Sequence, residues 1–137
     1  MNDLGTPIHT ELAEGLKVGD FLFLSSVDAL KEDGLSAGED LRTNLFYVLR
    51  KLQSVCMEAG GDLEDMVQLR IYVSASFYDP ASIRSILAEL FTPLPALSIL
   101  PINEMNGMIM ADGTAVILTS QPASMGCAGC QGCAART

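Results

Sequence analysis

The spacing of hydrophobic residues between positions 41 and 100 changes from that of a helix to that of a strand and back again. Apolar residues recur at helical spacing from Glu39 to Ala59 and predict an amphipathic helix. Gly60–Gly61 ends this helix, because glycine adopts the left-handed conformation of a helix cap at little cost. The predicted buried stripe comprises Leu41, Leu45, Val48, Leu49, Leu52, Val55, Cys56 and Ala59.

A second, shorter helix is predicted to start at Asp79–Pro80. This dipeptide combines a capping side chain with proline at the first helical position, and Pro93 and Pro95 end the helix. Its predicted buried stripe is Ile83, Ile86, Leu87, Leu90 and Phe91.

Strands are predicted on both sides of the second helix, at Met66–Ser74 and Ala96–Ile102. In the first of them, Val67, Leu69, Ile71 and Val73 share one face, and Gln68, Arg70 and Tyr72 share the other. The second face is mixed in polarity, which suits an interface or the wall of a site better than a dry core. A salt bridge between subunits and a ligand contact both remain open for Arg70.

The two ends of the chain carry weaker patterns. Ile8–Glu11 is predicted as a short strand, and Phe21–Ser26 as a buried strand that follows the turn residues Lys17–Asp20. Residues 28–38 are expected to form a loop. The last strand is predicted at Thr114–Ser120, after a hairpin turn for which Asn106–Gly107 and Asp112–Gly113 are equal alternatives.

Strands joined through two helices predict an α/β (α+β) fold, in which a mixed sheet carries both helices on one face. The length of 137 residues suits one domain with a hydrophobic core. We expect this domain to span residues 1–121, followed by a Cys- and Gly-rich tail at residues 122–137.

Composition narrows the function classes. The formal net charge of −9 opposes non-specific binding to nucleic acid, which requires a positive surface. The apolar runs are too short to cross a bilayer, and no basic segment followed by an apolar stretch marks a secretory signal. We therefore expect a cytoplasmic protein with neither a membrane nor a nucleic-acid partner.

Several segments together resemble the RidA family, also called the YjgF or reactive-intermediate deaminase family. The matching segments are Val18–Ser26, Glu58–Gly61, Val67–Val73, the end of the second helix at Phe91, and Pro95–Ser98. The similarity covers roughly residues 8–118.

The resemblance implies a chorismate-mutase-like fold and a homotrimer with ligand clefts between neighbouring subunits. It also implies hydrolysis of enamines and imines, such as 2-aminoacrylate, to a keto acid and ammonia, with no cofactor. In this chemistry a cation binds the substrate carboxylate, and a polar group places water at the carbon of the C=N bond. Arginine suits the first task, because its planar fork binds a carboxylate with two parallel hydrogen bonds.

The sequence departs from the family pattern at the site itself. At the position after Pro-Ala, where the family has its carboxylate-binding arginine, this chain has Leu97. Two positions later, where the family has a cysteine, it has Ile99. The catalytic glutamate falls on the shorter Asp112, and the asparagine of the second helix falls on Arg84. We therefore expect very low activity on 2-aminoacrylate.

The candidate site residues follow from this correspondence. Candidate catalytic residues are Asp112 and Ser98, and candidate substrate-binding positions are Ser25, Ser26, Arg84 and Leu97. Purely structural roles remain open for two of these residues. Arg84 would then be a solvated helix residue paired with an acid, and Asp112 would be a turn residue. Three functions follow: an enamine or imine hydrolase with an altered substrate, a non-catalytic binding or regulatory trimer, and a metal or redox role of the tail.

The tail contains Cys127, Cys130 and Cys133, with two Cys-x-x-Cys steps. Thiolates at this spacing can share a soft metal ion or an iron–sulfur cluster. Three ligands on a glycine-rich arm make an incomplete site, so we expect three independently reactive thiols and no bound metal.

Overall fold

A computed structural model of the chain describes residues 5–31, 33–105 and 107–118. The three tail cysteines and Asn106 lie outside the described residues. The described chain forms one six-stranded sheet with the order β1-β2-β3-β6-β4-β5. In this sheet β4 and β5 are parallel, and the other neighbouring strands are antiparallel.

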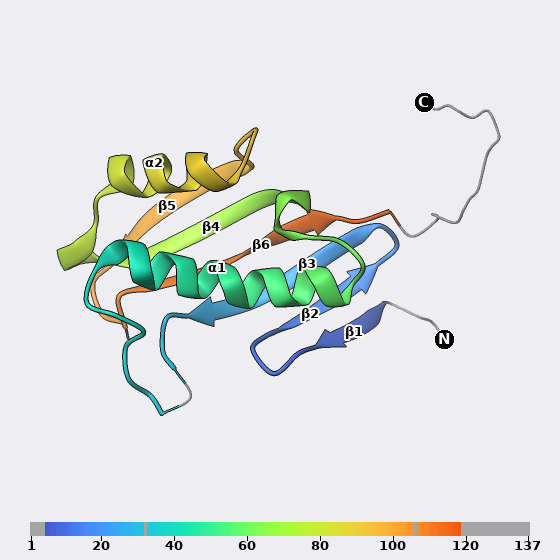
Figure 1. The fold of residues 1–137 in the computed structure, drawn as a ribbon, viewed down its shortest axis with the longest axis horizontal. Coiled ribbons are helices and arrows are strands. Elements are labelled where there is room, and N and C mark those ends of the chain that lie inside the picture. Colours follow the sequence, from blue (N-terminus) through green and yellow to red (C-terminus); the bar gives the residue numbers. More distant parts are fainter. Residues whose placement is uncertain (1–4, 32, 106, 119–137) are drawn as a thin grey trace.

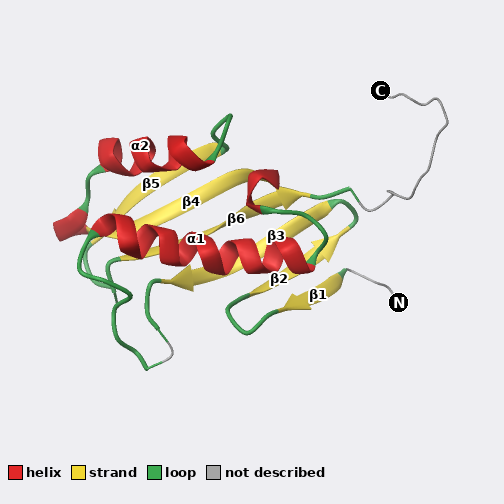
Figure 2. Cartoon of the chain, in the orientation of Figure 1, coloured by secondary structure: helices red, strands yellow, loops and turns green. Residues whose placement is uncertain are grey.

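The strands are β1 (Thr6–His9), β2 (Glu14–Val18), β3 (Phe21–Asp28), β4 (Met66–Ser74), β5 (Ala96–Ile102) and β6 (Ile109–Val116). The helices are α1 (Leu41–Glu58) and α2 (Pro80–Leu90), with short 3₁₀ turns at Leu63–Asp65 and Ala75–Phe77. Both helices lie on one face of the sheet, so the other face is left open within a single chain (Figures 1 and 2). No helix in the described part of the chain is long and apolar enough to span a membrane.

The helix ends follow from local chemistry. The Asp40 side chain accepts a hydrogen bond from the Thr43 backbone N–H, and Gly60 follows α1 with φ +96°. Asp79 caps α2 through the Ser82 backbone N–H, and Pro80 is the first helical residue. The α/β fold class and the bounds of β4 and β5 are therefore confirmed, and both helices lie where they were predicted.

One hydrophobic core lies between the helices and the sheet. Its fully buried large side chains include Leu22, Leu45, Leu52, Leu69, Ile71, Ile83, Leu87 and Ile109. Two side chains of the predicted buried faces are exposed instead: Val67 at 47% and Leu90 at 41%. The register between β4 and β6 shifts between Met66 and Gln68, and this bulge turns Met66 into the core and Val67 out of it.

The first half of the sheet differs from prediction in two ways. The strand β2 was not predicted, because its glycine and lysine break the apolar pattern. In β3 only alternate residues are buried, and Phe21 and Phe23 lie exposed on the open face at 52% and 47%. The expectation of a strand buried on both faces was therefore wrong for these residues.

The C-terminal prediction was also wrong in two respects. Asp112–Gly113 is not a turn but lies in the middle of β6, which begins at Ile109 rather than at Thr114. The strands β5 and β6 are not a hairpin either, because β4 lies between them and pairs with both. The sheet position of β6, between β3 and β4, satisfies its backbone on both sides and overrides the turn preference of Asp-Gly.

Candidate functional site

Polar side chains from three strands meet at Asp112 on the open face of the sheet. Asp112 stands in register with Arg70 of β4, across from β3. Its carboxylate accepts hydrogen bonds from Arg70 Nε at 2.6 Å, Ser26 Oγ at 3.0 Å and Tyr72 Oη at 3.3 Å. We call Ser26, Arg70, Tyr72 and Asp112 the Asp112 cluster.

A bulge in β3 brings Ser26 to this carboxylate. Leu24 pairs with Gly113 and Val27 pairs with Ala111, so that Ser25 and Ser26 together oppose Asp112. A bulge of this kind re-aims a side chain that would otherwise alternate to the wrong face, and bulges are frequent next to active sites.

Asp112 is nearly buried, with an exposed fraction of 8%. A carboxylate with so little water around it needs hydrogen-bond donors, and here three are supplied. The ion pair in turn affects Arg70: its hydrogen bond to Asp112, together with the charge of Asp112, raises the pKa of the guanidinium above its usual value.

Arg70 uses only Nε in this ion pair, and its side chain is 46% exposed. Within the described part of the chain, its two terminal nitrogens donate no hydrogen bond. These nitrogens form the fork that binds carboxylates and phosphates in pairs of parallel hydrogen bonds. The Asp112 cluster therefore holds an oriented cation with its binding edge free.

The surroundings of the cluster on β2 and β3 are apolar. Leu16 and Val18 of β2 lie opposite Phe23 and Phe21 of β3, and all four are more than a third exposed. The two phenylalanine rings stack with centroids 6.3 Å apart. An exposed apolar face of this kind beside a polar cluster is typical of a surface that is covered by a partner.

The structure brings together some of the predicted site residues. Ser26 and Asp112 are in direct contact, and Ser25 is exposed beside them at the bulge. Ser98 stands in register with Arg70 and is exposed, so it shares the strand face of the cluster.

The structure separates the others from this cluster. Leu97 is in register with buried Leu69, is half-buried, and packs against the core on the helix side. Arg84 is exposed on α2, which covers the opposite face of the sheet. Neither side chain therefore shares a face with Asp112 in a single chain.

Sequence reasoning did not identify Arg70 and Tyr72 as partners of Asp112. The available signal was the alternation of Gln68, Arg70 and Tyr72 along one strand face. That pattern showed which residues share a face, but not which strand lies beside it.

A groove of about 300 Å³ runs from the β3 bulge to α1. It is lined by Ser25 and Ser26 at the bulge, by Glu14 of β2 and Asp28 of β3, and by Lys51 of α1. Among the described residues, no three His, Cys, Asp or Glu side chains are grouped closely enough to hold a metal ion.

No protein-family model matches the sequence, and no curated protein matches it. Solved structures do match its fold. YyfA from Yersinia pestis, a protein of unknown function of the conserved Rid protein family, has a TM-score of 0.71 at 18% identity over 82% of this chain and 98% of YyfA.

RidA from the Antarctic bacterium Psychrobacter has a TM-score of 0.66 at 19% identity, covering 85% of this chain and 98% of RidA. TdcF from E. coli, solved with bound serine, has a TM-score of 0.70 at 16% identity over 81% and 98% of the two chains. The predicted YjgF-like architecture is thus confirmed: this chain has the fold of the Rid proteins.

Proposed function

We propose that this chain is a divergent RidA-like protein of the cytoplasm that binds a small carboxylate-bearing molecule at clefts between the subunits of a homotrimer. We further propose that it hydrolyses an enamine or imine other than 2-aminoacrylate. The observation that carries the proposal is the Asp112 cluster, in which a nearly buried carboxylate orients an arginine whose binding edge is free.

The trimer is supported by the open face of the sheet. Leu16, Val18, Phe21 and Phe23 leave an apolar surface around the polar cluster, and a second copy of the chain is the simplest cover for it. Light scattering is expected to give three times the 14.6 kDa chain mass. A monomer at micromolar concentration would contradict the assembly.

In the proposed reaction Arg70 takes the place of the arginine that is absent at position 97. Its two terminal nitrogens bind the substrate carboxylate and place the C=N carbon near Asp112. Three of about four acceptor positions of the Asp112 carboxylate are occupied, which leaves one for a water molecule. Ser98 lies on the same strand face and supplies a further hydroxyl for the substrate.

Asp112 orients this water and takes its proton as the oxygen attacks the C=N carbon. This proton passes to the nitrogen and gives a carbinolamine. Asp112 then carries the hydroxyl proton of the carbinolamine to the same nitrogen, so that the C=O bond forms, the C–N bond breaks, and the products are a keto acid and ammonia. A general base placed in this way contributes about a hundredfold or more in rate.

The binding step is tested with 2-oxobutyrate, a stable analogue of a keto-acid product, by NMR titration of the full chain. Arg70→Gln is expected to raise the dissociation constant about tenfold or more, because a charged hydrogen-bond pair is lost. Arg84→Gln is the matched control and is expected to bind as the wild type does. Loss of binding in Arg84→Gln alone would assign the cation to α2 and overturn the role of Arg70.

The chemical step is tested with 2-iminobutyrate generated in situ, by the rate at which ammonia and the keto acid appear. Asp112→Asn keeps the size of the side chain but removes the base, and it is expected to lower turnover by about a hundredfold while retaining binding. Equal turnover in Asp112→Asn and wild type would exclude Asp112 as the base.

The alternative is a non-catalytic binding or regulatory trimer. It is favoured by the three donors already directed at Asp112, which stabilise a carboxylate that need not take up a proton. The same experiments decide between the two functions, since binding of 2-oxobutyrate without any turnover of the imine supports the non-catalytic protein.

A further inference from the structure

Three hollows on the helix side of the molecule share two lining residues. Lys51, in the middle of α1, and Leu12, in the turn between β1 and β2, border all three. The largest measures about 330 Å³ and lies between α1, this turn and the chain that follows β3. The smallest, of about 100 Å³, lies between α1 and the turn. We call the largest and the smallest of these hollows together the Lys51 groove.

Lys51 is largely withdrawn from solvent, with a side-chain exposure of 12%. Its ammonium group donates to Asp28 Oδ1 at 3.2 Å and to the Leu30 carbonyl at 3.0 Å, and lies 5.1 Å from the centroid of the Tyr47 ring. An ammonium group has three N–H donors, and within the described part of the chain the third N–H of Lys51 donates no hydrogen bond. Lys51 is therefore a fixed cation with one donor left beside a cavity.

The charges around the groove favour an anion. Lys31 and Arg50 also line it, so three of the chain's 8 Lys and Arg residues gather in a protein of net charge −9. Among the described residues, the acids that line these two hollows are Glu11 and Asp28, so three cations stand against two acids. Glu14 borders only the third hollow, toward Ser25.

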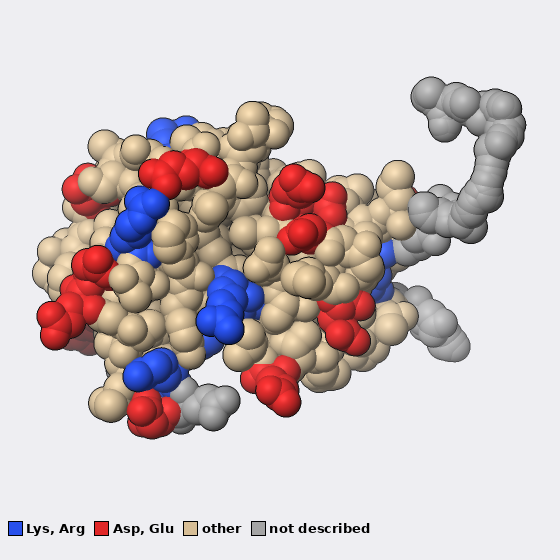
Figure 3. Space-filling view, in the orientation of Figure 1, with Lys and Arg blue, Asp and Glu red and all other residues tan. Residues whose placement is uncertain are grey.

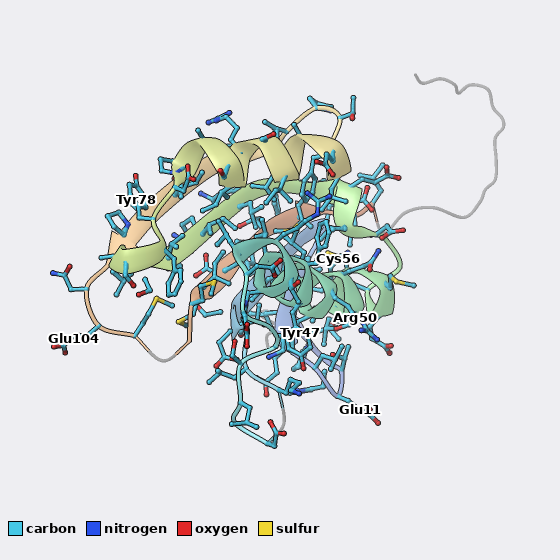
Figure 4. The ribbon with its side chains drawn as sticks, turned by 60° about the vertical axis from the view of Figure 1, so that its left-hand side comes forward. Glu11, Tyr47, Arg50, Cys56, Tyr78 and Glu104 are labelled. Carbon is cyan, nitrogen blue, oxygen red and sulfur yellow. The ribbon has the colours of Figure 1, made fainter. Side chains whose placement is uncertain are left out.

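The figures show the same arrangement. Basic side chains gather over the middle of α1 in the space-filling view (Figure 3). Tyr47 and Arg50 lie on the side of α1 above the turn that carries Glu11 (Figure 4).

We propose that the Lys51 groove is a second binding site, separate from the Asp112 cluster, for a small organic anion with a carboxylate or phosphate head and a short apolar body. The head group binds the free donor of Lys51 and the guanidinium of Arg50. The apolar body lies against Leu12, Leu30 and Tyr47, which line the same space. The volume is at the lower end of small-molecule sites, which excludes a dinucleotide.

The test is an NMR titration of the ¹⁵N-labelled full chain with three probes: inorganic phosphate, hexanoate and phenyl phosphate. Shifts are expected at Leu12, Tyr47, Arg50 and Lys51. Tighter binding of phenyl phosphate than of inorganic phosphate would show that the apolar lining contributes to affinity. Comparing the dissociation constants of hexanoate and phenyl phosphate distinguishes a carboxylate head group from a phosphate head group. No saturable shift with any probe up to about 10 mM would overturn the proposal, since even weak sites are filled at that concentration.

Lys51→Met keeps the length of the side chain without its charge, and is expected to weaken binding about tenfold or more. Lys17→Met is the matched control, because Lys17 does not line the groove and its amine donates a hydrogen bond to the Gly19 carbonyl. If Lys51→Met fails to fold, Arg50→Gln leaves the Lys51 contacts intact and is expected to weaken binding severalfold. Unchanged binding in Arg50→Gln and Lys51→Met would overturn the proposal.

Arg70→Gln separates this site from the proposed function. It is expected to leave binding in the Lys51 groove unchanged, so the two sites can fail independently. Loss of the Lys51 shifts in Arg70→Gln would show that the probes bind only at the Asp112 cluster.

Discussion

Gly113 tests the geometry on which the Asp112 cluster depends. It lies next to Asp112 in β6 and is in register with Leu69 of β4, beside the pair of Gln68 and Thr114. A Cβ atom at this position would overlap the backbone carbonyl oxygen of Gln68 and would lie 2.5 Å from Met66 Cε. The methionine side chain can turn away, but the carbonyl belongs to a strand that is paired on both sides. Gly113→Ala is therefore expected to force β4 and β6 apart.

The size of the effect follows from two opposing contributions. Overpacking a well-packed site costs about 1–3 kcal/mol, and we expect the upper part of this range because the obstacle is backbone. Replacing glycine by alanine in a strand returns about 0.5–1 kcal/mol of chain entropy. The net loss in the free energy of unfolding is then about 1–2.5 kcal/mol, which lowers the melting temperature of a chain of this length by about 3–10 °C.

The assay is thermal unfolding followed by circular dichroism, at a fixed protein concentration because assembly affects the midpoint. Gly60→Ala is the contrasting variant: its φ of +96° is strained for alanine, but nothing lies within 4 Å of the added atom. It is expected to cost only about 1 kcal/mol. If Gly113→Ala melted at or above the wild-type temperature, the bulge of β4 and the pairing of Arg70 with Asp112 would need revision.

Four further predictions concern the rest of the domain. Asn44 is fully buried and bonds to Ser36 and to the carbonyls of Gly38 and Asp40, so Asn44→Ala is expected to lower the free energy of unfolding by about 2–3 kcal/mol in urea titrations. Burial raises the pKa of the Cys56 thiol to about 12, so it should resist alkylation at pH 8 in the folded protein and react once unfolded, as peptide mass spectrometry would show. Between pH 9.0 and about 12 the unfolded thiol ionises and the folded one does not, so stability should fall with rising pH more steeply in wild type than in Cys56→Ala. Leu97→Arg is expected to destabilise the protein without creating activity on 2-aminoacrylate, because the side chain packs toward the core; a gain of turnover would contradict this.

Local chemistry in the sequence was enough to predict the helices and two strands. The end of α1 before Gly60–Gly61, the start of α2 at Asp79–Pro80 and the bounds of β4 and β5 depend on neighbours within a few residues. The same pattern showed that β4 has one mixed face, and it led to the prediction that this face forms the wall of a site or an interface. These features could be predicted because their causes are short in range.

The site required contacts that no local pattern contains. Ser26 is 86 residues from Asp112 in the chain, and Arg70 is 42 residues from it. Which side chains meet depends on β6 lying between β3 and β4, and on one bulge in each neighbouring strand. A single shift in register would have turned Asp112 toward the core.

The dipeptide Asp112–Gly113 shows most clearly the difference between what local sequence determines and what tertiary structure determines. By itself the dipeptide favours a turn, because both residues tolerate turn conformations and aspartate bonds to its own backbone. In the folded chain the aspartate is held by an arginine from the next strand, and the glycine fits where the Gln68 carbonyl leaves no room for a side chain. The sequence by itself determined the helices, two of the strands and the polar face of β4, because their interactions are local. Tertiary structure alone decided the site, because its interactions join strands that are distant in sequence.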